Sequence, residues 1–416
     1  MTKGSMSIMA ASVIGLAAVI SGCGSGVGGS GGSTTASGGT ITVGTLYASS
    51  GQFATSSMAE YQGLKFWAHE VNTQGGVYVK ATGKKEKIKL VAYNDQSSTQ
   101  TATTLYQQLI TQNHVNMLVA DFGSVLTSVG VTIAQENKML LFDQSGSGTT
   151  FFDSTPPNPY IVLTSIQASS LWPDSLSNYI LKNNIKKVAI IYGANDFTGA
   201  QDTTLVNNLK AAGVTPVYNH PVPTATTNYS ALLNSVAATH PDMVIELGYD
   251  TNDIPFLQAV DASQYKFPKV FTIFPGQESA LFAKDIGVSN LAGTYTYAAP
   301  PLTKVSGVNY GMSLSQFTSQ FEKYAGASSI DFENIAGYNT GLILQKTLAT
   351  SKSLKQTAFR QAINTFSGKV TTIEGTFRIN TQTGAQEGLP FPIGKWVDNN
   401  GQLGVKIYES TIQGEL

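Results

Sequence analysis

Short apolar runs alternate with helix-like segments from residue 41 to residue 298, and this alternation restricts the fold more than any other feature. The run Val188–Ile191 is apolar throughout, which is typical of a strand buried on both faces of a sheet. Further strands are expected at 41–46, 77–79, 88–93, 116–120, 139–142, 160–164, 214–218, 243–247, 270–273 and 294–298. Such strands, separated by helices, predict parallel sheets covered on both faces. They are more numerous than one open sheet holds comfortably, so two sheets in two lobes are favoured.

The helices show the complementary periodicity. Leu64, Trp67, Ala68 and Val71 recur at i, i+3, i+4 and i+7, which predicts one buried helix face after a loop over 47–57. Beyond residue 310 the pattern changes, with helices expected near 313–324, 332–350 and 354–365, then strands near 370–379, 392–397 and 403–409. A tail that returns to complete both lobes would explain this change.

Composition excludes several classes of protein. The chain has 416 residues, of which 42% are hydrophobic and 12% charged, as in a globular protein long enough for two lobes. The net charge of −1 gives no electrostatic basis for nucleic-acid binding. Cys23 is the only cysteine, so neither an intrachain disulfide nor a cysteine metal site is expected, and no cofactor is predicted.

The N-terminal region has the features of an export signal. Lys3 precedes an apolar stretch over 6–20, and Ser21 and Gly22 are small residues directly before Cys23. The pattern resembles a bacterial lipobox, in which the cysteine is lipidated and begins the mature protein. We therefore expect a signal peptide over 1–22, a Gly/Ser-rich linker over 23–40, and an extracytoplasmic protein anchored to the membrane. A transmembrane helix is the alternative, but the stretch is shorter than the ~20 residues that span a bilayer.

Two loops at strand ends carry ligand-binding chemistry. Asp121, Gly123 and Ser124 lie between a strand and a helix, and Ser124 is a candidate N-cap. The free N–H groups and the dipole of that helix favour an anion such as a carboxylate, although a plain helix cap is the alternative. The next loop places Ser145 and Ser147 among glycines, either for ligand contact or as a solvent-exposed loop.

The order of these elements resembles the type I extracytoplasmic solute-binding proteins of ABC importers, typified by the leucine/isoleucine/valine-binding proteins. The matching stretches are 43–52, 63–76, 118–124, 188–199 and 336–338. The resemblance implies an α/β fold of two doubly wound parallel-sheet lobes joined by a three-crossover hinge. Lobe 1 would comprise 41–163 plus 299–372, and lobe 2 would comprise 164–298 plus 373–416. We expect a monomer that closes on a small ligand.

The resemblance also implies roles for individual residues. Ser124 and the backbone amides near Gly123 would hold a ligand carboxylate, with further contacts from Ser145 and Ser147. Aromatic rings from lobe 2 would enclose the ligand's body, and additional contacts would come from the first loop. These last residues are Phe197 and Tyr249 from lobe 2, and Tyr47 and Ser50 from the first loop.

One departure from the family concerns the ligand's ammonium group. The branched-chain amino acid binders carry a glutamate for it, and Gly276 takes that place here. Glu278, Asp121 or Glu333 would have to serve instead, since a buried ammonium needs an anionic or well-placed polar partner. If none reaches the ligand, a carboxylate, an aromatic acid, an amide or a urea-like solute is expected.

Three functions follow from these features. The first is a solute-binding protein that delivers its ligand to an ABC permease, and the second is a sensor that reports the ligand to a membrane receptor. The third is a surface hydrolase, which the histidines argue against because none neighbours a nucleophile motif or has metal-ligand spacing. These histidines are His69, His114, His220 and His240. We expect no enzymatic activity.

Overall fold

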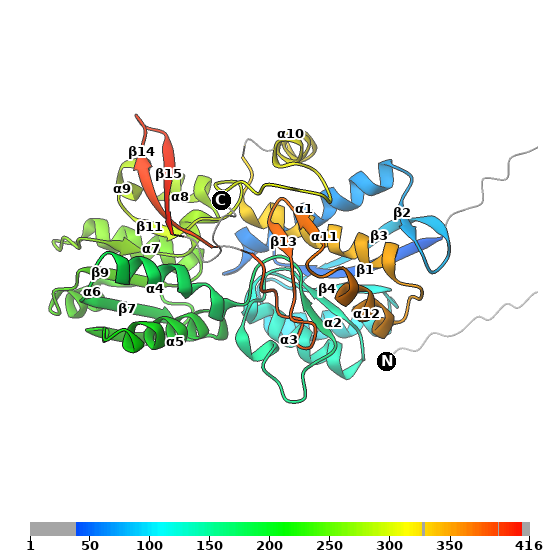
Figure 1. The fold of residues 1–416 in the computed structure, drawn as a ribbon, viewed down its shortest axis with the longest axis horizontal. Helices are drawn as coiled ribbons and strands as arrows, with labels where there is room; N and C mark the ends of the chain where they lie inside the picture. Colours follow the sequence, from blue (N-terminus) through cyan, green and yellow to red (C-terminus); the bar gives the residue numbers. More distant parts are fainter. Residues whose placement is uncertain (1–38, 327–328, 390, 410–416) are drawn as a thin grey trace, which may run out of the picture. The chain divides into compact units, whose positions relative to one another are not determined.

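The computed structural model describes residues 39–326, 329–389 and 391–409. Two large sheets of mostly parallel strands form within this part of the chain, which confirms the predicted α/β class (Figure 1). The predicted signal peptide, Cys23 and nearly all of the predicted linker lie outside the described residues.

The first sheet has six strands, parallel except for one antiparallel edge strand. In spatial order they are β2 (Val77–Val79), β3 (Lys84–Asn94), β1 (Thr40–Tyr47), β4 (Met117–Val119), β5 (Leu141–Asp143) and β6 (Ile161–Leu163). Side chains alternate between its faces, so Met117 and Leu118 enter different hydrophobic clusters. We call the part of the chain built around this sheet lobe 1.

Helices cover both faces of the first sheet. One face packs against α1 (Ala54–Thr73), α10 (Leu314–Ala325), α11 (Phe332–Thr350) and α12 (Gln356–Phe366). The other face packs against α2 (Thr99–Thr111) and α3 (Gly123–Glu136). The predicted stripe on α1 is buried, with Leu64 and Trp67 exposed by no more than 1%. Helix α1 begins at Ala54, so the predicted loop over 47–57 is too long.

The second sheet, around which lobe 2 is built, has seven strands. In spatial order they are β15 (Leu403–Glu409), β14 (Ile393–Asp398), β11 (Tyr295–Tyr297), β10 (Val270–Phe271), β9 (Met243–Leu247), β7 (Val188–Gly193) and β8 (Tyr218–Val222). Figure 1 shows β14 and β15 in red beside β11, and both pair in antiparallel fashion. The end of the chain therefore completes a sheet that the middle of the chain begins.

Helices surround the second sheet as well. They are α4 (Pro173–Lys182), α5 (Asp196–Ala211), α6 (Ser230–Ala237), α7 (Asp250–Ala262), α8 (Ser279–Asp285) and α9 (Val288–Leu291). Short 3-10 turns occur at Thr149–Phe151, Ser169–Leu171 and Phe274–Gly276. Helix α5 begins where the Asn195 side chain accepts the Thr198 N–H at 3.2 Å, an ordinary N-cap.

The strand predicted at 214–218 is wrong by several residues. Gly213 has φ +78°, and the Val214 N–H donates to the Leu209 carbonyl, so this segment ends α5 in a left-handed turn. Strand β8 starts at Tyr218 and contains Pro221, which an edge strand tolerates because one of its sides needs no ladder hydrogen bond.

Connecting segments between the sheets run side by side. The Leu163 N–H donates to the Gly384 carbonyl and the Ala168 N–H to the Gln386 carbonyl, both at 3.0 Å. The Ala298 N–H donates to the Pro392 carbonyl at 2.8 Å. These backbone bonds tie the chain together where it passes from one lobe to the other.

A hairpin of β12 (Val370–Thr372) and β13 (Gly375–Phe377) precedes the last connection. Val370, Phe377 and Ile379 are buried in the same cluster as α1 and α12, on lobe 1. Between the strands, Glu374 is buried and accepts hydrogen bonds from the Ser165 hydroxyl and the Asn339 amide. The expected lobe boundary at 372/373 falls inside this hairpin.

Candidate functional site

A narrow cavity of about 10 Å³ lies at the carboxyl ends of strands from both sheets, with room for little more than one water molecule. Such strand ends are where open α/β sheets bind ligands, and an organic ligand would need the walls of this cavity to move apart. Its walls come from both lobes and from the segment that connects them. The lining residues are Glu60, Phe122, Gly123, Ser145, Ile166, Trp172, Phe197, Tyr249, Phe274, Gln277, Phe332 and Glu333.

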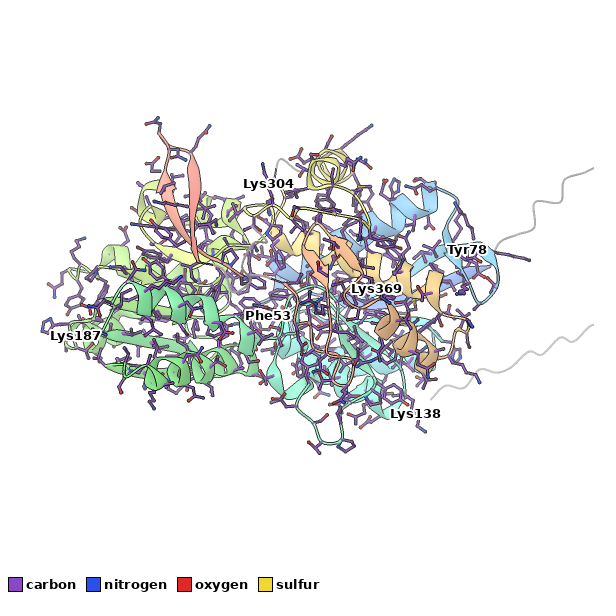
Figure 2. The ribbon with its side chains drawn as sticks, viewed as in Figure 1. Phe53, Tyr78, Lys138, Lys187, Lys304 and Lys369 are labelled. Carbon is purple, nitrogen blue, oxygen red and sulfur yellow. The ribbon has the colours of Figure 1, made fainter. Side chains whose placement is uncertain are left out.

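Aromatic rings form the largest part of the wall. The Tyr249 ring lies 5.3 Å from that of Phe197, 5.8 Å from Phe274 and 5.9 Å from Phe122, measured between centroids. Phe53, labelled in Figure 2, supports them from α1's N-terminus, with its ring centroid 5.1 Å from that of Tyr249. Rings at these separations pack favourably and offer their faces and edges to an enclosed apolar group.

Two buried carboxyl groups face the same space. Glu60 is 0% and Glu333 is 1% exposed. Among the described atoms, Glu60 Oε1 and both carboxyl oxygens of Glu333 have no hydrogen-bond partner, while Glu60 Oε2 accepts from Gln144 at 3.2 Å. Burial, and then repulsion from neighbouring carboxylates, raises the pKa of each group well above its usual range.

Glycines bring the two helices that carry these carboxyl groups together. A Cβ on Gly63 would lie 2.0 Å from the Asn334 carbonyl oxygen, and one on Gly337 would lie 1.9 Å from the Glu60 carbonyl oxygen. Helices α1 and α11 therefore cross backbone to backbone. Glu60 lies one turn before Gly63, and Glu333 one turn before Gly337, so the crossing sets both carboxyl groups at the cavity.

The N-terminus of α3 reaches the cavity through Gly123. Its φ of +70° is in the left-handed region that favours glycine, and a Cβ there would lie 3.3 Å from the Tyr249 hydroxyl. The Gly123 N–H donates to the Ser145 hydroxyl at 3.1 Å. The Tyr249 hydroxyl beside it is buried without a hydrogen-bond partner among the described atoms, and burial raises the pKa of this phenol. The first amide of this helix is therefore used by a side chain of the protein.

Four of the residues selected from sequence line the cavity, and the other six do not. The lining residues are Gly123, Ser145, Phe197 and Tyr249. Those outside it are Tyr47, Ser50, Asp121, Ser124, Ser147 and Glu278. In β1, Tyr47 stacks on Tyr61 at 4.6 Å, and Ser50 is exposed in the turn before α1.

Ser124 is not the N-cap that the sequence suggested. Helix α3 begins at Gly123 with Phe122 in the capping position, and the Ser124 hydroxyl accepts the Gly148 N–H at 2.9 Å. The left-handed Gly123 moves the start of the helix forward, so Ser124 lies within the first turn. Ser147 is also buried, but its hydroxyl has no partner among the described atoms and does not reach the cavity.

The acids expected to hold an ammonium also divide into residues that line the cavity and residues that do not. Asp121 accepts from the Ser57 hydroxyl at 2.5 Å and the Phe122 N–H at 2.7 Å, and it does not line the cavity. Glu278 accepts from the Ser56 hydroxyl at 2.5 Å, across the two lobes. Of the three acids considered, only Glu333 lines the cavity.

Sequence reasoning missed Glu60 and most of the aromatic wall. Glu60 interrupts the buried face of α1, and a charged residue at such a position is a signal that the sequence offered. Phe122 directly precedes Gly123, which was selected from the sequence, whereas no local sequence pattern identifies the remaining aromatic residues as part of the site. These are Trp172, Phe274 and Phe332.

The charges around the cavity are all of one sign. Among the described residues that line it there is no lysine, arginine or histidine. Lys138, Lys187, Lys304 and Lys369, labelled in Figure 2, are all exposed on the surface.

The four histidines are exposed too, and the described part of the chain has no cluster of three or more His, Cys, Asp or Glu side chains suited to a metal. Nor does any described helix have the length and apolar character to cross a bilayer.

Comparisons with known proteins agree with this architecture. The family model described as "Periplasmic binding protein" matches residues 40–400. Leu/Ile/Val-binding protein homolog 7 of Brucella melitensis biotype 1 is 21% identical over 338 residues, which cover 78% of this chain and 80% of the relative. Homolog 8 of Brucella abortus is 25% identical over 235 residues, covering 54% and 56%.

Solved structures share the fold at low sequence identity. The branched-chain amino acid transporter substrate-binding protein LivJ of Streptococcus pneumoniae, in complex with isoleucine, has a TM-score of 0.72 and 17% identity, covering 89% of this chain and 99% of that one. A solute-binding protein of an R. palustris ABC transporter, in complex with 4-hydroxybenzoate, has a TM-score of 0.74 and 18% identity, covering 89% and 96%.

Proposed function

The chain belongs to the periplasmic binding protein family, in its type I branched-chain amino acid group, and we propose that it is an extracytoplasmic lipoprotein that captures a small solute between its two lobes and delivers it to the permease of an ABC importer. The observation that carries this proposal is the cavity whose walls come from strand ends of both sheets. A site built from two lobes is completed only when they close. Ligand binding then favours the closed state.

Contacts across the two lobes support closure as the working motion. The Gln52 amide donates to the Thr224 carbonyl at 2.8 Å, and the Thr150 hydroxyl donates to the Asp196 carboxylate at 2.6 Å. The Ser56–Glu278 bond is a third polar contact between the lobes. Apolar contacts accompany these bonds, since the Phe53 and Phe122 rings of lobe 1 pack against the Tyr249 ring of lobe 2.

We further propose that the lobe boundaries follow the expected ranges except at the last connection. Because Val370, Phe377 and Ile379 pack in the core of lobe 1, that connection would begin beyond Ile379 rather than at 372/373. Limited proteolysis tests this division: cuts between the lobes should fall beyond Ile379, and a cut inside the hairpin would contradict it.

The lipid anchor and the export signal remain proposals from the sequence. Changing Cys23 to alanine should move the protein from the detergent phase to the aqueous phase in a detergent partition of expressing cells. It should also abolish labelling by a radioactive fatty acid. Unchanged partition and labelling would rule out anchoring through this cysteine.

The binding function is tested with a thermal-shift panel on the purified protein. The panel includes amino acids, carboxylates, amides, urea and amines, and calorimetry and small-angle scattering follow on each compound that raises the melting temperature. A ligand at a hundred times its Kd stabilises the protein by about 2.7 kcal/mol and should make it more compact. Delivery is tested by uptake of the bound compound in cells with and without the gene. A panel in which no compound stabilises the protein contradicts the proposal.

A further inference from the structure

The polar groups of the cavity are suited to positive charge. Three carboxyl oxygens there, Glu60 Oε1 and both oxygens of Glu333, have no partner among the described atoms. Buried acceptors without donors are costly, so a ligand that supplies donors is strongly favoured over one that supplies acceptors. A primary ammonium group carries three N–H donors, one for each of these oxygens.

The rest of the wall also suits a cation with an apolar body. Phe122, Phe197, Tyr249 and Phe274 offer ring faces, which attract an ammonium group and enclose apolar carbon. Two other polar groups are neutral. The Trp172 indole N–H is already donated to the Gln167 carbonyl at 2.9 Å, and the unpartnered Gln277 amide N–H suits a hydroxyl or carbonyl oxygen.

The place that a ligand carboxylate would take is filled by the protein. An α-carboxylate is expected at the N-terminus of α3, where free N–H groups and the helix dipole favour an anion. Here the Tyr249 hydroxyl lies against the start of α3, 3.3 Å from where a Gly123 Cβ would be, and the Gly123 N–H is used by Ser145. The Ser124 hydroxyl is bonded to the Gly148 N–H. No lining residue carries a positive charge to replace these donors.

We propose that the ligand of this cavity is an organic ammonium cation with an aromatic or branched apolar body and with no carboxylate beside the ammonium. The inference rests on the proposed solute-binding function and names its ligand class. Glu60 and Glu333 bind the ammonium, the aromatic rings enclose the body, and Tyr249 occupies the anion site at α3.

Ligand binding is then linked to protons. Around Glu60 and Glu333 the charged neighbours are all acidic: Asp121, Asp143, Asp250, Glu278 and Asp331. Burial raises the pKa of Glu60 and of Glu333, which favours their neutral forms in the ligand-free protein. A bound ammonium favours the ionised carboxylates, so binding releases protons and the affinity rises with pH across the titration of these groups.

Calorimetry with a matched ligand set tests the inference on the purified full-length protein. The probes are 2-phenylethylamine, L-phenylalanine, 3-phenylpropanoate and 3-phenylpropanamide, which share a phenyl body and differ in their polar group. An aliphatic set repeats the comparison with 3-methylbutylamine, L-leucine and 4-methylpentanoate. An amine should bind at least about tenfold more tightly than its amino acid, carboxylate or amide counterpart. Its binding enthalpy should differ between buffers of different ionisation enthalpy, because protons are released.

Variants separate a direct role of the carboxyl groups from a structural one. Glu333→Gln and Glu60→Gln should each lower amine affinity at least about tenfold and reduce the proton release. Glu246→Gln is the matched control, because Glu246 is a buried acid that accepts from the Tyr229 hydroxyl at 3.1 Å and does not line the cavity. Tyr249→Phe removes the hydroxyl that lies against Gly123 at the start of α3, so L-phenylalanine should gain affinity relative to 2-phenylethylamine.

The outcomes distinguish this inference from the proposed function. If a carboxylate, an amide or an amino acid binds most tightly, the ligand class is wrong and the solute-binding function stands. If an amine binds without proton release and equally well in Glu333→Gln and Glu60→Gln, the assignment of the carboxyl groups is overturned. If neither set binds, the inference fails, and the wider thermal-shift panel then decides the function separately.

Discussion

Glu374 gives the strongest prediction about stability. It lies where lobe 1 meets the connecting segments, 3% exposed, and its carboxyl oxygens accept from Ser165 and Asn339. Burial raises its pKa to about 8, and the two hydrogen bonds only partly oppose this. In the unfolded chain a glutamate titrates near 4.3. Between these values the folded protein holds a proton that the unfolded chain has lost.

The sign of the pH dependence follows directly. Since the folded state binds more protons in this window, the free energy of unfolding falls as pH rises, by about 1.4 kcal/mol per pH unit for one group. Glu374→Gln replaces the carboxyl group with an amide of nearly the same shape that does not titrate. Relative to the wild type, the variant should gain about 3 kcal/mol between pH 5 and pH 7.

Urea unfolding at pH 5, 6, 7 and 8, at constant ionic strength, measures this difference. Other buried acids contribute equally to both proteins and cancel in the comparison. Glu246→Gln is an informative second variant, because burial raises the pKa of Glu246 to about 7 and its effect should end about one pH unit lower. Parallel stability curves for wild type and Glu374→Gln would refute the reasoning, since they would mean that the carboxyl is ionised in the folded protein.

Close backbone approaches give further predictions. Gly337→Ala should destabilise the protein by more than about 2 kcal/mol in urea unfolding, because its Cβ would lie 1.9 Å from the Glu60 carbonyl oxygen. Gly199→Ala is the control on a helix with nothing within 4 Å, and it should be neutral or stabilising; equal losses in both would contradict the packing argument. Gly276→Glu should lower the melting temperature rather than create an ammonium site, since a Cβ there would lie 1.8 Å from the Tyr297 carbonyl oxygen. A well-folded Gly276→Glu protein with new amino acid affinity would overturn that conclusion.

The sequence was informative wherever the site is built from strand ends. Gly123 and Ser145 directly follow buried strands, and parallel strands bring their carboxyl ends to one edge, so local patterns sufficed to select them. Phe197 and Tyr249 were selected through the family resemblance. Both lie just beyond strands of the second sheet.

The sequence was uninformative where the site depends on contacts between distant elements. Glu60 and Glu333 meet only because two helices cross at glycines, and that contact spans more than half of the chain. Ser124 looked like an N-cap because the left-handed conformation of Gly123 is not visible in sequence. Asp121 was a candidate partner for a ligand ammonium in the sequence, yet its carboxylate accepts a hydrogen bond from the Ser57 hydroxyl of α1.

Under the proposed function, the same helix crossing would couple ligand recognition to lobe closure. On α1, Ser56 donates to Glu278 of the opposite lobe at 2.5 Å, and Glu60 faces the cavity one turn later. At the start of α11, the Phe332 N–H donates to the Gln277 carbonyl at 2.9 Å, and the next residue is Glu333. Because α1 and α11 cross without intervening side chains at their glycines, neither helix shifts alone. An ammonium that draws the two carboxyl groups together would therefore position the Ser56 hydroxyl and the Phe332 N–H to donate across the lobes. A ligand that leaves the two carboxyl groups unpaired would not.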